Sequence, residues 1–186
     1  MIWGIGRVIV SAIHFIHSQY RGNRGFTLLE LIITVSVMMI LIGAAVPSFS
    51  RIIEENKIKR LATEIEWLLV LAKSESVMRS KPVLVKSNKI TSTPNAASDW
   101  VIEATVSGES TVISRVIGQQ FSGLKIQRGF KSDTITFNPL TGRPNYNGNF
   151  SFSSGENKMV KVKVNNETGR LYICSEGGGY GYSKCS

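Results

Sequence analysis

FTLLELIITVSVMMILIGAAV, residues 26–46, is the most uniformly apolar segment of this 186-residue chain. It is 21 residues long and holds one charged residue, Glu30. Because about 20 consecutive apolar residues are needed for a helix to cross a bilayer, it predicts a transmembrane helix over residues 26–46. Arg7, Arg21 and Arg24 precede it, and residues 1–25 contain no acid. We therefore expect the N-terminus to stay cytoplasmic and the rest of the chain to be exported.

Glu30 is the unusual residue of this segment, because a carboxylate inside hydrocarbon is costly and indicates a function. Two interpretations stay open. Glu30 is fifth in the segment, so its carboxylate reaches the lipid headgroups, or it meets a positive charge supplied by a neighbouring chain. A secretory signal peptide fits poorly. Its cleavage site is a small residue that follows the apolar region, whereas the small residue Gly25 precedes the apolar segment of this chain.

The helix is expected to continue beyond the apolar segment. Pro47 follows it and is expected to bend the helix rather than end it. Residues 47–81 then form an amphipathic part, which ends near Arg79, before Lys81-Pro82. The apolar residues at helical spacing are Ile58, Leu61, Ala62, Ile65, Leu68, Leu69 and Ala72.

Residues 82–186 change to a period of two, which is typical of β-strands. Short strands after one long helix predict an α+β fold, with an antiparallel sheet packed on the apolar stripe of the helix. The expected strands are Val83–Lys86, Trp100–Val106, Thr111–Ile117, Leu124–Gln127, Thr134–Phe137, Asn149–Phe152, Met159–Val164 and Arg170–Ile173.

The stretch Arg24-Gly25-Phe26-Thr27-Leu28-Leu29-Glu30-Leu31 resembles the cleavage signature of type IV prepilins and type II secretion pseudopilins. The resemblance implies that residues 1–25 are a leader, which a prepilin peptidase removes by cutting between Gly25 and Phe26. It also implies N-methylation of Phe26, and pairing of Glu30 with the Phe26 amine of a neighbouring subunit. The helix over residues 26–81 would anchor the subunit in the membrane and later form the filament core.

Later segments are similar to the minor pilins called GspH/FimT-like. They are Phe137–Arg143, Gly148-Asn149-Phe150 and Gly169–Cys174. The resemblance implies a bacterial inner-membrane protein that crosses once, with a periplasmic C-terminal domain, and that later joins a pilus or pseudopilus. It would initiate or cap a type IV pilus or a type II secretion pseudopilus. The implied partners are other minor and major pilins or pseudopilins, the prepilin peptidase and an inner-membrane assembly platform.

The reactive side chains argue against an enzyme. The two cysteines, Cys174 and Cys185, follow the predicted crossing, where an oxidising compartment favours a disulfide over two free thiols. Both histidines, His14 and His17, lie in the expected leader, so a mature chain has no histidine for general-base or Ser–His chemistry. We expect no cofactor, and no metal site for want of ligands.

Net charge supports a second hypothesis, in which the exported domain binds DNA. The chain has 22 Lys and Arg against 13 Asp and Glu, a net charge of +9. From residue 120 on, nine basic residues face four acids, a balance of +5. Basic side chains near tyrosines bind phosphates and stack on bases, whereas a merely solubilising basic surface is the simpler alternative. The candidate DNA-binding residues are Arg143, Lys161, Lys163, Arg170 and Lys184.

Overall fold

A computed structural model of the chain describes residues 26–155 and 158–185, and it leaves the side chains of residues 44–48 undescribed. The chain divides into two compact units, Met1–Val46 and Pro47–Ser186, each described here by itself. The expected leader, residues 1–25, lies outside the described residues.

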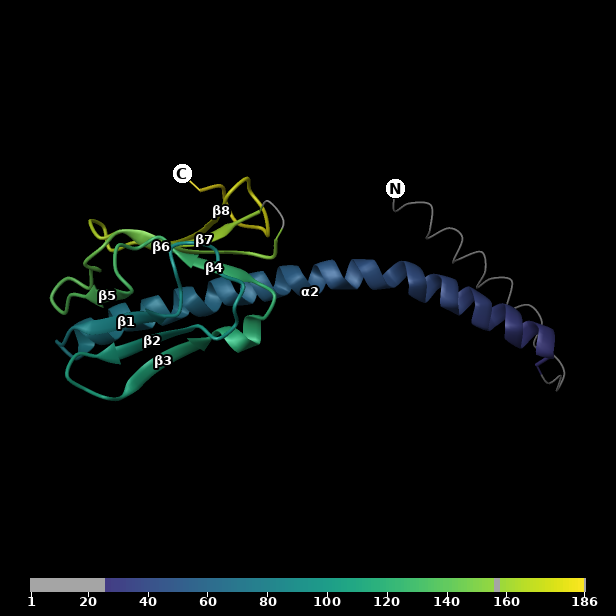
Figure 1. Ribbon diagram of the computed structural model, residues 1–186, viewed down its shortest axis with the longest axis horizontal. Helices are drawn as coiled ribbons and strands as arrows, with labels where there is room; N and C mark the ends of the chain where they lie inside the picture. The colour runs from purple at the N-terminus through teal and green to yellow at the C-terminus, as the bar shows by residue number, and fades with distance from the viewer. Residues whose placement is uncertain (1–25, 156–157, 186) are drawn as a thin grey trace. The chain divides into compact units, whose positions relative to one another are not determined.

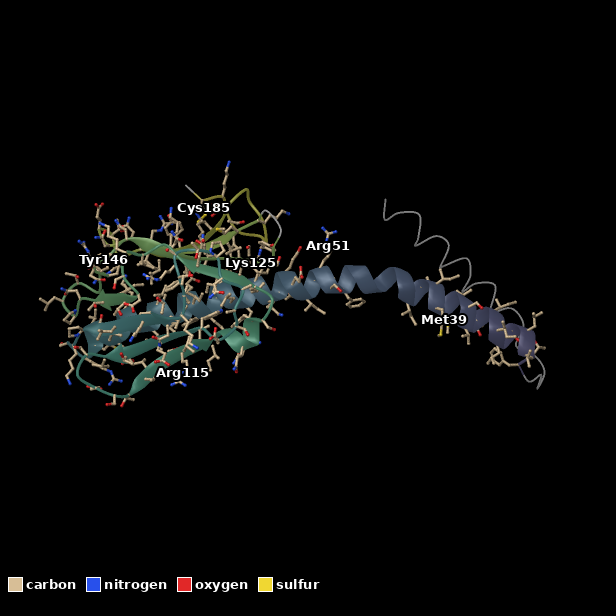
Figure 2. The ribbon with its side chains drawn as sticks, viewed as in Figure 1. Met39, Arg51, Arg115, Lys125, Tyr146 and Cys185 are labelled. Carbon is tan, nitrogen blue, oxygen red and sulfur yellow. A yellow bond between two sulfur atoms is a disulfide. The ribbon has the colours of Figure 1, made fainter. Side chains whose placement is uncertain are left out.

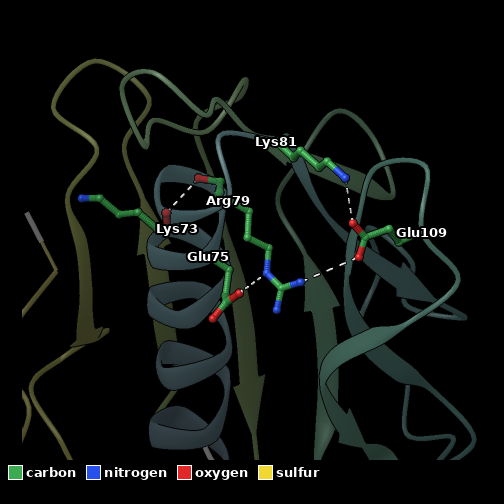
Figure 3. Close-up of polar contacts among 6 residues, drawn as sticks. Lys73, Glu75, Arg79, Lys81 and Glu109 are labelled. Atoms are coloured by element: carbon green, nitrogen blue, oxygen red, sulfur yellow. Dashed lines mark hydrogen bonds and ion pairs between the residues drawn. The ribbon is translucent and has the colours of Figure 1, made fainter.

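Helix α2 spans Leu28–Met78, a length of 51 residues. Its backbone is helical through Pro47, so this proline does not end the helix, as predicted. The helix ends one residue before the expected Arg79, and Ser80 adopts a φ of 51°. Figure 3 shows how this end is fixed: the Arg79 guanidinium lies 2.5 Å from the Glu75 carboxylate and 3.7 Å from Glu109, which follows β2 (Val101–Val106).

In the described part of the chain, eight strands follow the helix, and all eight overlap the predicted ones. They form two four-stranded sheets in which every pairing is antiparallel, with orders β3-β2-β1-β5 and β4-β6-β7-β8. Besides β2, the strands are β1 (Val83–Asn88), β3 (Val112–Ile117), β4 (Lys125–Arg128), β5 (Thr134–Phe137), β6 (Gly148–Ser153), β7 (Val160–Val164) and β8 (Leu171–Ser175).

The α+β class is confirmed, but the expectation of a single sheet is wrong. The chain returns β5 to pair with β1, whereas β4 pairs with β6. Each sheet therefore contains one pair of strands that are not consecutive in the sequence. No local pattern encodes these two pairings. Both sheets still have a polar outer face and an apolar inner face, as the period of two requires.

The core lies where the two sheets meet the helix. Figure 1 shows α2 running between β1, β2 and β3 on one side and β6, β7 and β8 on the other. All seven residues of the predicted helical stripe are buried, and they join inward side chains of both sheets in one cluster. The largest buried side chains from the sheet side of this cluster are Trp100, Phe121, Phe137, Phe150 and Phe152.

Candidate functional site

The N-terminal motif forms the first turn of α2. Thr27 precedes the helix, and its Oγ1 accepts a hydrogen bond from the backbone N–H of Glu30 at 3.2 Å. The Thr27 carbonyl also accepts the N–H of Leu31 at 3.1 Å. Thr27 is therefore the N-cap, and Glu30 sits in the first turn, where a negative charge interacts favourably with the helix dipole.

This cap gives Glu30 a local role in addition to the one expected from the sequence. The signal was present, because Thr27-Leu28-Leu29-Glu30 has the Ser/Thr-x-x-Glu spacing of a capping box. The carboxylate of Glu30 lies on an exposed residue. An exposed carboxylate in the first turn remains available to a positive group outside the chain, so the two roles are compatible.

The apolar residues around Glu30 are exposed in the single chain. Phe26 is 72 % exposed and Met39, labelled in Figure 2, is 69 % exposed. Burying such side chains stabilises an assembly by about 1.5–3 kcal/mol for each fully covered Leu, Ile, Phe or Met. Every residue from 26 to 43 is exposed, so this whole segment presents apolar surface that none of the described residues covers.

The structure describes the side chains of residues 26–43 and of residues 49–185 except 156–157. Among these residues, no helix is both long and apolar enough to span a membrane. The span predicted over residues 26–46 includes positions 44–46, whose side chains lie outside the description, and it stays a prediction. Cleavage after Gly25 falls outside the described residues as well.

The C-terminal tail is tied to the second sheet by the predicted disulfide between Cys174, in β8, and Cys185. Figure 2 labels Cys185 beside this sheet. Two backbone hydrogen bonds add to the cross-link: Ser175 N–H donates to the Ser183 carbonyl at 2.9 Å, and Cys185 N–H donates to the Ser175 carbonyl at 3.1 Å. The tail therefore lies along the end of β8.

Two of the five candidate DNA-binding residues, Lys163 and Arg170, lie beside Tyr172 on the outer face of the second sheet. Lys163 of β7 is paired in register with Tyr172 of β8. The Lys163 ammonium lies 5.4 Å from the Tyr172 ring centroid, and the Arg170 guanidinium lies 5.2 Å from it. This geometry is typical of cation–π contacts. A tyrosine beside two cations combines an aromatic ring with phosphate-binding groups.

The other candidates are dispersed around this group. Lys161 forms an ion pair with Glu176, which neutralises part of its charge. Lys184 is exposed in the tail beside Ser175. Arg143 follows β5 and packs against the turn before β8, because a Cβ built on Gly169 would lie 3.3 Å from Arg143 Cγ.

Two further basic residues were not among the candidates from sequence: Lys73 bonds to the turn before β8, and Lys125 lies on β4, at the opposite edge of the second sheet. Lys73 of α2 donates a hydrogen bond from Nζ to the Gly169 carbonyl at 2.9 Å. Gly169 has a φ of 67°, a conformation that favours glycine, so the lysine holds a turn that few other residues can form. Lys125 is exposed on β4 of the same sheet. No local pattern marks Lys73, because its partner is 96 residues away.

Among the described residues, no group of three or more His, Cys, Asp or Glu is arranged to hold a metal ion. Two pKa values are shifted next to the tail. Burial raises the pKa of the Glu66 carboxyl. Burial also raises the pKa of Tyr182, against a hydrogen bond with Thr63 that lowers it.

Comparison with known proteins gives two matches to family models. Residues 61–169 match the family described as type II transport protein GspH. Residues 20–46 match the prokaryotic N-terminal methylation motif. No curated protein matches the chain.

Two crystal forms of the type IV minor pilin FimU from Pseudomonas aeruginosa are structurally similar. One has a TM-score of 0.48 at 17 % identity, covering 64 % of this chain and 90 % of that one. The other has a TM-score of 0.44 at 15 % identity, covering 62 % and 90 %. The GspH match covers more than half of the 186 residues, and the chain therefore belongs to the GspH family of pilin-like proteins.

Proposed function

We propose that the chain is a minor pilin or pseudopilin that initiates or caps a type IV pilus or a type II secretion pseudopilus. A prepilin peptidase cuts between Gly25 and Phe26 and methylates the new amine of Phe26. The observation that carries this proposal is the N-terminal methylation motif matched over residues 20–46, which lies N-terminal to the GspH family match over residues 61–169.

Glu30 is the assembly residue in this proposal. Its exposed carboxylate lies in the first turn of α2, and the Phe26 amine of a neighbouring subunit is the positive partner. Inside an apolar environment such a pair is favourable only when both charges meet, because an unpaired charge there is costly. The ion pair would thus set the axial position of one subunit against the next.

The exposed apolar segment around Glu30 needs a cover of lipid or of other helices. We therefore place the precursor in the bacterial inner membrane, crossing once, with the C-terminal domain in the periplasm. The Cys174–Cys185 disulfide fits an oxidising compartment. Partners are other minor and major pilins or pseudopilins and an inner-membrane assembly platform, and the subunit ends in the pilus or pseudopilus.

Substitution of Glu30 tests this role. Glu30→Ala and Glu30→Gln both remove the negative charge. We expect each to abolish incorporation of the subunit into filaments, while cleavage still occurs and leaves Phe26 as the new N-terminus. Glu54→Ala is the matched control, because Glu54 is an exposed acid on the same helix. The measurement is the amount of subunit in sheared filaments relative to the membrane fraction. Normal incorporation of Glu30→Ala would contradict the assembly role.

A second candidate function, DNA binding during uptake for natural transformation, is favoured by the placement of Lys163 and Arg170 beside the Tyr172 ring. Replacing Lys161, Lys163 and Arg170 by Ala removes three cations. For duplex DNA we expect the magnitude of the slope of log K against log salt to fall by about 0.9 for each of these cations that contacts a phosphate, and by about 2.7 at most. An equal triple replacement of Lys86, Lys89 and Arg115, which are exposed residues outside this group, is the control. Equal slopes for both triple variants would contradict DNA binding at Tyr172.

A further inference from the structure

β8 is an edge strand of the second sheet, with β7 as its one strand partner. In an antiparallel pair, residues alternate between those bonded to the partner strand and those whose peptide groups point away from it. Asn165 N–H bonds to the Arg170 carbonyl and Glu176 N–H bonds to the Met159 carbonyl. By this alternation the N–H and C=O groups of Leu171, Ile173 and Ser175 point to the open side of β8.

The tail occupies only one end of that open side. Both outward peptide groups of Ser175 are bonded to the tail, through Ser183 and Cys185. Among the described residues, the outward peptide groups of Leu171 and Ile173 have no hydrogen-bond partner. Unpaired ladder groups at a sheet edge are a template for another strand. The edge of β8 that is open to another strand is therefore its first part, from Leu171 to Ile173.

A groove of about 470 Å³ lies between this edge and the helix. Its lining includes Val70, Lys73 and Val77 of α2 and Arg170 and Leu171 at the start of β8. A second hollow of about 210 Å³ shares Val70 and is lined also by Glu66 and Trp67. Trp67 is 67 % exposed, and large exposed aromatic side chains are common anchors of protein interfaces.

The two ends of this surface carry opposite charge. Arg170 lies at the end near Gly169, where the Lys73 ammonium is held on the Gly169 carbonyl. In Figure 3 the Lys73 side chain points away from the Glu75–Arg79–Glu109 ion pairs at the end of the helix. Glu66 lies at the other end, beside Trp67. A segment bound in the groove is thus complementary in charge when it places an acidic side chain near Arg170 and a basic side chain near Glu66.

From this geometry we propose that the groove between α2 and β8 binds an extended segment of another filament subunit, which adds as a strand to the open edge of β8. Its backbone bonds to Leu171 and Ile173, an apolar side chain packs on Val70 and Val77, and a carboxylate faces Arg170. This deepens the proposed function, because it names how a partner subunit is held by the globular domain.

A strand explains the site better than a helix or DNA. A helix satisfies its own backbone groups and leaves the β8 edge open, whereas an added strand supplies main-chain hydrogen bonds and places alternate side chains in the groove. DNA has no group that matches the apolar floor formed by Val70, Val77 and Leu171, and Glu66 would repel its phosphates.

The probe is a capped heptapeptide, Thr-Asp-Thr-Val-Thr-Lys-Thr, whose Asp, Val and Lys share one face when it is extended. We expect it to protect the amides of Leu171 and Ile173 from hydrogen exchange in the full chain held in detergent micelles. Two isomers, N-methylated on alternate sets of residues, are the matched probes. Because only one set of peptide N–H groups faces β8, one isomer loses protection and the other keeps it.

Val70→Asp tests the groove and Leu140→Asp is its control, since Leu140 is an exposed apolar residue outside the groove. We expect Val70→Asp to weaken peptide binding by roughly tenfold or more, and Leu140→Asp to leave it unchanged. Three results would overturn the proposal: equal binding of both methylated isomers, no protection by any peptide, or protection of the same amides by an oligonucleotide instead. None of them would alter cleavage at Phe26, so the proposed function is tested separately.

Discussion

Loss of the Cys174–Cys185 disulfide should destabilise the globular domain by an amount that follows from the length of the loop between the two cysteines. The two cysteines are 11 residues apart. In the chain-entropy treatment, a cross-link over such a loop stabilises the folded state by about 2.8 kcal/mol. Each 1.4 kcal/mol is a factor of ten, so the folded-to-unfolded ratio should fall by about 100-fold. With urea m-values of about 1–3 kcal/mol/M, the midpoint should move down by roughly 1–3 M.

Cys185→Ser is the appropriate variant, because Cys185 lies in the tail whereas Cys174 is buried. Urea unfolding of the full chain in micelles can be followed by the change in tryptophan fluorescence that accompanies exposure of Trp100, which is buried and stacked near Phe121 with ring centroids 6.3 Å apart. Ser183→Ala, in the same tail, is the control and should not shift the midpoint.

A reductant should lower the midpoint of the unmodified chain as much as Cys185→Ser does, and it should not change the variant. Equal midpoints for the unmodified chain and Cys185→Ser under oxidising conditions would refute this reasoning. The tail would then be held by Tyr180 and Tyr182, which pack against the core, and by the hydrogen bonds to Ser175 alone.

Two further predictions concern the core and pH. Gly148→Ala places a Cβ 2.3 Å from Phe130 Cδ1, so we expect thermal unfolding to show a loss of about 1–3 kcal/mol, and an unchanged Tm would contradict this close packing. Burial raises the pKa of Glu66, so the folded state holds a proton more tightly than the unfolded one. Stability should therefore fall as pH rises from the ordinary carboxyl pKa through the raised value, and Glu66→Gln should remove this fall in urea titrations; an identical pH profile for both chains would refute the assignment.

Much of the fold follows from periodicity that can be read locally. The stripe Ile58–Ala72 is buried as predicted, because residues at helical spacing share one face. The alternation Val160, Val162 and Val164 against Lys161 and Lys163 gives the inward and outward faces of β7, because successive side chains of a strand point to opposite faces.

The division into two sheets could not be predicted in that way. The pairing of β1 with β5 joins Val83 to Phe137, and it depends on how two apolar faces share one helix rather than on either strand alone. The same holds for the site. Lys163, Arg170 and Tyr172 are selected by residue type, but their contact depends on the register of β7 and β8.

The N-terminal motif shows the opposite case, because its geometry is local and its role is not. The Thr27 cap could be predicted from spacing. The partner of Glu30 belongs to another molecule in the proposed function, so neither the sequence nor a single folded chain contains it. The same argument applies to the open edge of β8, whose exposure is visible only once the sheet order is known.

In the proposed function, this chain is processed and assembled as a pilin-like subunit. The most direct test is the mass of its N-terminal peptide, isolated from the membranes of cells that produce it. We expect a peptide that begins at Phe26 and carries one methyl group on its amine. An N-terminus that retains Gly25 and the residues before it, in cells with an active prepilin peptidase, would contradict the account.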